Sequence, residues 1–209
     1  MMKKLLSEMT LEELWELFPI RLSAHQDCWR DWYQAEAERI RDFLADTEYV
    51  ISHIGSTAIN GIWAKPIVDI LLEIPKTTPM EDIKNVLARN GYILMSEAEN
   101  RASFNRGYTS EGFAEQVFHL HLRYRGDHDE LYFRDYMNEY PSRAKQYEAL
   151  KRSLWKQYEH NRDAYTQAKG PFIVENTVRA KQEYGGRYED WESRLRALQS
   201  AWCENRDSF

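Results

Sequence analysis

The sequence predicts an α+β fold in which a small mixed β-sheet with packed helices is followed by an all-helical C-terminal half. Two observations support this prediction. Up to about residue 126, short apolar and β-branched segments alternate with segments of helical period, and from residue 127 onward only the helical period remains. We therefore expect an α/β core over residues 25–126, a helical region over residues 127–209 packed on that core, and a helical extension over residues 1–24.

The composition excludes several classes of protein. Hydrophobic residues make up 43% of the 209 residues and charged residues 30%, which allows a buried core and argues against a wholly disordered chain. No apolar run approaches the roughly 18 residues of a membrane-spanning helix, and the N-terminus does not resemble a signal peptide. The net charge of −6 argues against strong binding to nucleic acids. Two cysteines are too few for a disulfide scaffold, so a cytoplasmic location is expected.

Two helices are expected before the first strand. Thr10 and Glu13 form a capping box, which predicts the start of a helix that Pro19 ends. The second helix is expected from about Asp27 to Leu44, because its aromatic and aliphatic residues recur at helical spacing.

The predicted sheet is formed by apolar runs bounded by glycine, proline or polar turns. Strands are expected over residues 49–54, 67–74, 92–95 and 116–124, with a helix over residues 79–90. The polar stretch 96–115 is interpreted as mostly loop, with a strand near residues 102–108 as the alternative. In the C-terminal half we expect helix breaks at Pro141, Gly170-Pro171 and Gly185-Gly186, and one long helix from about Ser142 to Lys169.

A glycine–serine pair ends the first predicted strand. Gly55 permits close approach of a ligand to the backbone, and the Ser56 hydroxyl and free N–H groups can hold a phosphate, helped by the N-terminus of the helix that is expected to follow. An ordinary turn is the alternative interpretation.

Asp69 lies inside the apolar strand 67–74. An ionised carboxylate in that position costs several kcal/mol unless it is paired, hydrated or bound to a metal ion, so we expect it at a cleft. A structural aspartate paired with Arg or Lys is the alternative. Glu73 lies roughly 13 Å further along the strand and cannot share the same metal ion, so we expect it at a solvated strand end.

Two histidines share one face of the last predicted strand. His119 and His121 alternate with apolar residues, and neighbouring positions on one face are about 6.6–7 Å apart. Their imidazoles can converge on one ligand or metal ion, whereas a pair of half-buried, hydrogen-bonded histidines is the alternative.

The predicted long helix places three cations on its mostly apolar face, interleaved with three tyrosines. These cations are Lys151, Arg162 and Lys169. Either their long side chains extend to solvent, or this face lines the cleft and binds an anionic ligand such as a polyphosphate. Lys151 needs a counter-charge, which Asp69, a bound anion or Asp135 could supply.

Several of these segments, in this order, resemble the GrpB family, also called UPF0157. The resemblance covers about residues 25–183 and is carried by the segments 29–40, 53–61, 65–71, 119–122 and 133–137, by Tyr147 with Leu150-Lys151, and by Tyr165-Thr166, Lys169 and Phe172-Ile173. It implies a polymerase-β-like nucleotidyltransferase core, in which Gly-Ser ends one strand and an Asp-x-Asp pair on the next holds Mg²⁺ against nucleotide phosphates.

The chain departs from that pattern at the carboxylates. Positions 67 and 71 are Ile and Leu, so Asp69 has no partner on its strand, and the third carboxylate of the pattern is replaced by His119 and His121. This departure argues against nucleotidyl transfer by two metal ions and leaves a one-metal or metal-free site.

The resemblance implies a nucleotidyltransferase-like protein that binds a nucleotide or another phosphorylated ligand and transfers a nucleotidyl group. The alternatives are a non-catalytic module for a nucleotide or a coenzyme-A precursor, because family members occur fused behind dephospho-coenzyme-A kinase, and a scaffold with a degenerate site. Asp69 is the expected catalytic residue and, with His121, the expected ligand of Mg²⁺ or another divalent metal ion. The ligand-binding residues expected are Gly55, Ser56, Lys65, His119, Arg134, Lys151 and Lys169.

Overall fold

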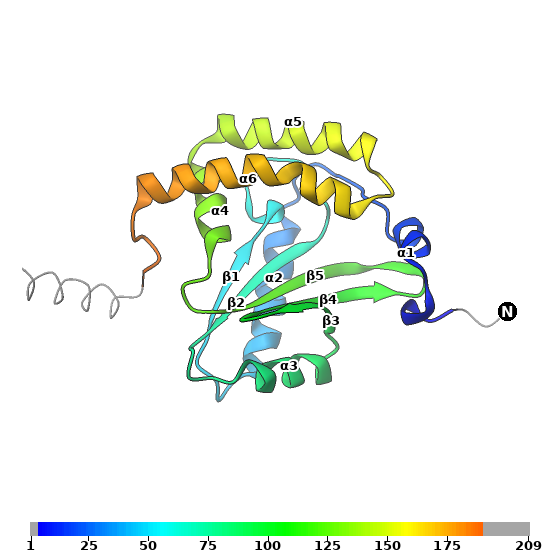
Figure 1. The fold of residues 1–209 in the computed structure, drawn as a ribbon, viewed down its shortest axis with the longest axis vertical. Helices are drawn as coiled ribbons and strands as arrows, with labels where there is room; N and C mark the ends of the chain where they lie inside the picture. Colours follow the sequence, from blue (N-terminus) through cyan, green and yellow to red (C-terminus); the bar gives the residue numbers. More distant parts are fainter. Residues whose placement is uncertain (1–3, 190–209) are drawn as a thin grey trace, which may run out of the picture.

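The computed structural model describes residues 4–189, which form a five-stranded mixed sheet and six α-helices (Figure 1). The strands are β1 (Val50–Ile54), β2 (Val68–Ile74), β3 (Ile93–Ala98), β4 (Arg101–Thr109) and β5 (Gly112–Tyr124). The helices are α1 (Leu11–Leu17), α2 (Cys28–Phe43), α3 (Met80–Arg89), α4 (Asp129–Glu139), α5 (Pro141–Gln157) and α6 (Arg162–Tyr184). The α+β class expected from the sequence is therefore confirmed.

The strand order is β1-β2-β5-β4-β3, and β2 and β5 are the parallel pair among otherwise antiparallel neighbours. The interpretation of residues 96–115 as mostly loop is wrong, because most of this stretch forms the end of β3, all of β4 and the start of β5. Every residue of β3 is exposed at the sheet edge. An edge strand of this kind lacks the alternation of buried residues by which a strand is recognised in a sequence.

One face of the sheet packs against α2 and α3 and forms the main core. Trp29 and Ile40 of α2 and Leu87 of α3 meet Ile70 of β2 and Leu120 of β5 there, all of them fully buried. In Figure 1, α2 crosses behind the strands and α3 lies below them. Because side chains alternate along a strand, the neighbouring residues of β2 and β5 point to the opposite face.

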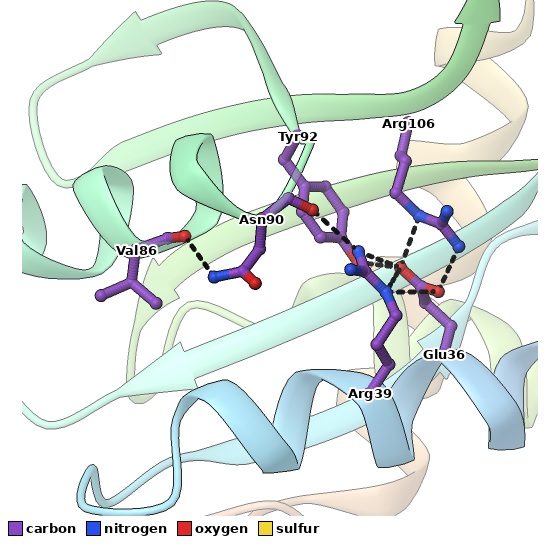
Figure 2. A network of polar contacts seen from close by, with 6 residues as sticks. All are labelled: Glu36, Arg39, Val86, Asn90, Tyr92 and Arg106. Atoms are coloured by element: carbon purple, nitrogen blue, oxygen red, sulfur yellow. Dashed lines mark hydrogen bonds and ion pairs between the residues drawn. The ribbon is translucent and has the colours of Figure 1, made fainter.

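A polar network on the core side joins α2 to the sheet (Figure 2). Glu36 accepts hydrogen bonds from Arg106 Nε (2.8 Å), from Arg39 Nη2 (3.2 Å) and from the Tyr92 hydroxyl. Arg39 Nη2 also donates to the carbonyl of Asn90 (3.1 Å). Burial opposes ionisation of Glu36, but the hydrogen bonds from the two arginines and the tyrosine prevail and lower its pKa.

The helical half covers the other face of the sheet, with α5 and α6 side by side in Figure 1. The single long helix expected over 142–169 is wrong: α5 ends at Gln157, and α6 begins at Arg162 with the Asn161 side chain capping the N–H of Ala164 at 3.0 Å. The break expected at Gly170-Pro171 is wrong as well, because α6 continues through both residues. A proline inside a helix costs about 3 kcal/mol, and directly after it Phe172 and Ile173 pack against a cluster that includes residues of α4 and α5.

The capping box of α1 is confirmed, since Thr10 and Glu13 exchange the expected hydrogen bonds. Phe18, directly after α1, is buried and packs on Tyr108 and Phe113 of the β4–β5 hairpin. Across residues 4–189, each helix is too short or too polar to traverse a lipid bilayer.

Candidate functional site

A cavity of about 240 Å³ lies where the polar face of β2 and β5 meets α5 and α6; we call it the lysine pocket. Its lining side chains come from both halves of the chain. They are Asp69, His119 and His121 from the sheet, Ser56, Lys65 and Ile67 from the preceding loops, and Lys151, Arg162, Tyr165, Thr166 and Lys169 from the helices. The structure thus brings together seven of the eight side chains that the sequence singled out around Asp69, Arg134 being the exception, with Gly55 directly adjacent.

The parallel pairing of β2 with β5 places Asp69 beside His119. The two side chains meet at 3.2 Å between Oδ1 and Nδ1, and Nε2 of His121 lies 3.8 Å from the same oxygen. Burial works against ionisation of Asp69, but the hydrogen bond from His119 and the nearby His121 prevail and hold its pKa well below the usual range. Burial lowers the pKa of His119. We therefore assign a neutral His119 that donates through Nδ1 and accepts at Nε2 from the Tyr108 hydroxyl at 2.8 Å.

Gly55 is required by the close approach of β1 to Asp69. Its φ of 71° lies in the left-handed region, and a Cβ placed there would lie 2.1 Å from Oδ2 of Asp69. The chain continues as a three-residue 3-10 turn, Ser56–Ala58, and not as the expected helix. The contribution expected from a helix N-terminus is therefore absent here, and Ser56 contributes to the pocket by its own groups.

Four cations line the lysine pocket, and within residues 4–189 none of them forms an ion pair with a carboxylate. Lys151 donates to the carbonyl of Trp63 and lies 4.7 Å from the centre of the Tyr147 ring. Lys65 and Lys169 lie 5.7 and 4.5 Å from the centre of the Tyr165 ring, on which both cations rest.

Burial is the main cause of the lowered pKa of these lysines. It lowers the pKa of Lys65 to about 7, with Arg162 and Lys169 adding to the effect and Asp69 opposing it. It likewise lowers the pKa of Lys151 to about 7 and shifts that of Lys169 downward. The pocket therefore holds positive charge at the cost of desolvation, and an anion in it would restore the protonated lysines.

Arg134 lies elsewhere, so its expected place in this site is wrong. Because α4 packs on β1, Nη1 of Arg134 donates to the carbonyl of His53 (2.8 Å) and Nε to Asp135 (2.6 Å). It lines a separate cavity of about 660 Å³ together with Tyr33 and Asn60. Asp135 is engaged there and is not the counter-charge of Lys151.

Glu73 was expected at a solvated strand end, and this expectation is wrong because its side chain is buried. Its Oε1 accepts from Nδ1 of His128 at 2.9 Å and from the N–H of Gly126 at 3.3 Å, because the chain turns back over the end of β2 after β5. This carboxylate serves the junction between the sheet and α4 and is not part of the lysine pocket.

One contact of the site was missed from the sequence. Tyr108, the hydrogen-bond partner of His119, lies in the stretch interpreted as loop. The alternation of residues 101–109 against 117–124 would have been the signal for a β-hairpin. Tyr165 and Thr166 belong to the residues that carry the family resemblance but were given no role in the site, and the structure places both in the lining of the lysine pocket.

The side chains present do not form a cage for a metal ion. Among the residues that the structure describes, no three His, Cys, Asp or Glu side chains are grouped so as to hold one. Within the described part of the chain Asp69 is the one carboxylate lining the pocket, and its Oδ1 accepts from His119 with His121 3.8 Å away. Such a set fits a hard cation only when phosphate oxygens of a ligand and water complete its coordination.

The sequence was compared with known proteins and solved structures. The family described as "GrpB protein" matches residues 19–179. The UPF0157 protein YqkA of Bacillus subtilis is 29% identical over 85% of this chain, and the chain spans about half (52%) of that relative's length. The glutamate-rich protein GrpB of Alkalihalophilus pseudofirmus is 31% identical over 74% of this chain and 91% of its own.

The conserved protein GrpB from Enterococcus faecalis has a similar solved structure, with a TM-score of 0.68, 25% identity, and coverage of 78% of this chain and 99% of that one. The Cid1 poly(U) polymerase reaches a TM-score of 0.46 at 10% identity over 71% of this chain and 47% of its own, which is too low to carry an argument. The match of the family over residues 19–179, together with the relatives, establishes that the chain belongs to the GrpB family.

Proposed function

We propose that the lysine pocket binds the phosphate groups of a nucleotide or of another phosphorylated ligand. The observation that carries the proposal is the charge imbalance: Lys65, Lys151, Arg162 and Lys169 line about 240 Å³ together with a single carboxylate, Asp69. Lys151 is buried and the other three cations are half-buried, and holding them without a counter-charge is costly. The lowered pKa of Lys65 and Lys151, about 7, reflects that cost. A phosphate would relieve it and would accept hydrogen bonds from several of these donors at once.

In this proposal each residue has a defined part. The three lysines and Arg162 neutralise the phosphate, and Ser56 adds a hydroxyl donor. A divalent cation such as Mg²⁺ enters together with the ligand, held by its phosphate oxygens, by water and by Asp69, with His121 beside that carboxylate.

Binding without nucleotidyl transfer is the second candidate, and one observation favours it. A general base works best when its pKa is near the working pH, whereas the histidines beside Asp69 hold its pKa far below that. Asp69 is therefore suited to orient His119 or to hold a cation, and poorly suited to take a proton from an acceptor hydroxyl. A module that holds a nucleotide or a coenzyme-A precursor fits this carboxylate better than a transferase that uses it as a base.

A titration with pyrophosphate and with nucleoside triphosphates, with and without Mg²⁺, tests the proposal. A ligand at 100 times its Kd should stabilise the protein by about 2.7 kcal/mol, which a thermal-shift assay detects. Lys151→Met should weaken binding by about ten- to a hundredfold, since it removes one charge-assisted contact of about 1.5–3 kcal/mol. Lys156→Met is the matched control, an exposed lysine on the same helix outside the pocket. Equal affinity of the two variants, or no binding by the unaltered protein, would overturn the proposal.

A further inference from the structure

A second cavity of about 520 Å³ adjoins the lysine pocket; we call it the α1 cavity. The two cavities share four lining residues: His119, His121, Arg162 and Thr166. Arg162 stands at the junction, with its guanidinium carbon 5.6 Å from the centre of the Tyr108 ring. A ligand in the lysine pocket can therefore extend past Arg162 into the α1 cavity.

The walls of the α1 cavity are mainly apolar. Leu11, Leu14 and Trp15 of α1 face Ile93 and Met95 of the edge strand β3 across it. Asn105 and Ser103 of β4 and the Asp163 side chain are among its few polar lining groups besides the shared ones. The wall opposite the cations of the lysine pocket thus suits a hydrocarbon or an aromatic ring, and not a second anion.

Helix α1 presents an apolar stripe that the fold does not bury. None of its residues is buried, and Leu11 is 58% exposed, whereas the apolar stripe of a surface helix normally packs on the core. The helix is fixed at its C-terminal end, where Phe18 packs 4.7 Å from the Tyr108 ring. Its stripe consequently borders the α1 cavity in place of a packed interface.

The two cavities differ in volume, and each suits a different part of a ligand. Sites for whole small molecules usually measure about 300–1,000 Å³, and the lysine pocket, at about 240 Å³, falls below that range. It has room for phosphate groups, and the rest of an organic ligand must lie outside it. The α1 cavity lies within that range and adjoins the pocket at the four lining residues that the two cavities share.

From this juxtaposition we infer that the ligand is an organic phosphate with an apolar or aromatic group, and that this group binds in the α1 cavity, covered by α1. The inference rests on the proposed function, because it assigns the remainder of the ligand whose phosphate the lysine pocket holds. Helix α1 is then part of the binding site and determines which organic phosphates bind.

Calorimetric titration of the full chain with a series of n-alkyl phosphates, from methyl to hexyl, tests the inference. Each methylene buried in the α1 cavity contributes about 0.8 kcal/mol, so affinity should rise by up to about fourfold per added carbon. Leu14→Asn and Trp15→Asn should flatten this increase and leave the affinity for pyrophosphate unchanged. Val174→Asn is the matched control, because Val174 is 63% exposed on α6 and lines neither cavity.

The outcomes separate the two proposals. If pyrophosphate binds but the affinity does not rise with alkyl length, the inference is overturned and the phosphate pocket stands. If the affinity rises equally with alkyl length in Leu14→Asn and in the control, the alkyl chain binds outside the α1 cavity, and the inference is overturned as well. If no phosphate compound binds at all, the proposed function fails, and this inference with it. Because Leu14 and Trp15 are only half-buried, both variants should still fold, and their melting temperatures are measured beside that of the unaltered protein.

Discussion

Two carboxylates on opposite faces of the sheet, Glu36 and Asp69, have contrasting surroundings. Around Glu36 both nearby cations contact the carboxylate directly: Arg106 and Arg39 donate to it, Tyr92 donates to it as well, and Nη2 of Arg39 also donates to the Asn90 carbonyl (Figure 2). Around Asp69 the contacts come from histidines, and the four cations of the lysine pocket contact no carboxylate of the described chain.

A structural charge network and a candidate binding site differ in whether their cations contact a carboxylate. In the Glu36 network each arginine is paired with the carboxylate, and the network joins α2 to the sheet, so no ligand is needed to give its cations a counter-charge. The Asp69 region carries a surplus of positive charge in a cavity, and burial there disfavours the charged lysines and lowers the pKa of Lys65 and Lys151 to about 7. A surplus of this kind is what a phosphate would complete.

The largest effect is expected from opening the closed network. Glu36→Gln leaves two guanidiniums without their counter-charge, and breaking a buried pair from one side costs about 3–5 kcal/mol. Because the side chains of Arg39 and Arg106 are 36% and 30% exposed, we expect the lower end, about 3 kcal/mol, in denaturant unfolding. The exposed pair of Glu175 with Arg179 provides the control: Glu175→Gln should change stability by less than about 1 kcal/mol. Equal effects would contradict the contrast drawn here.

Gly55→Ala should destabilise the protein by displacing Asp69. The new Cβ collides with Oδ2 of that carboxylate, and overpacking costs about 1–3 kcal/mol in addition to the strain of a positive φ. Gly61→Ala is the matched control, since Gly61 has nearly the same φ, 68°, and no atom within 4 Å of the added carbon. Urea unfolding should show a clearly larger loss for Gly55→Ala. The affinity for pyrophosphate should fall only in that variant, because only there is Asp69 displaced.

The stability of the unliganded protein should rise with pH between about 7 and 9. In the folded state Lys65 and Lys151 have pKa values of about 7, whereas in the unfolded state they stay protonated to about pH 10.4, so the unfolded state binds more protons in this window. We expect a gain on the order of 1–2 kcal/mol per lysine in chemical unfolding. Lys151→Met should lose its share of that gain. A stability that is flat or falls over the window would show that these lysines remain charged.

The last prediction concerns the ligand. Because a phosphate needs protonated lysines, its affinity for the pocket should decrease as the pH rises above about 7, by up to about tenfold per pH unit for each lysine that must regain a proton. Calorimetry in buffers of different ionisation enthalpy should show proton uptake on binding at pH 8. No such uptake is expected from the Glu36 network, whose arginines already contact a carboxylate. Absence of proton uptake in the titration would argue that the anion binds outside the lysine pocket.

Local patterns in the sequence determined much of this protein. The capping box of α1, the apolar runs of β1 and β2 and the period of α2 each depend on neighbours along the chain, and each lies where it was expected. Asp69 was identified as a site residue for a local reason too, since a carboxylate inside an apolar strand requires a partner. The alternation of His119 and His121 followed from the period of a strand.

The contacts among these residues depend on strand pairing and helix packing, which the local sequence patterns do not specify. The register that sets Asp69 beside His119 depends on the pairing of strands 50 positions apart, which no local period encodes. Lys151 and Lys169 lie on two helices and not one, because the chain reverses between α5 and α6. Both helices pack over the same face of the sheet, so both lysines line one pocket. Arg134 contacts the His53 carbonyl of β1, outside the lysine pocket, for the same reason. A helix period gives the face on which a side chain lies, and only packing determines what that face contacts.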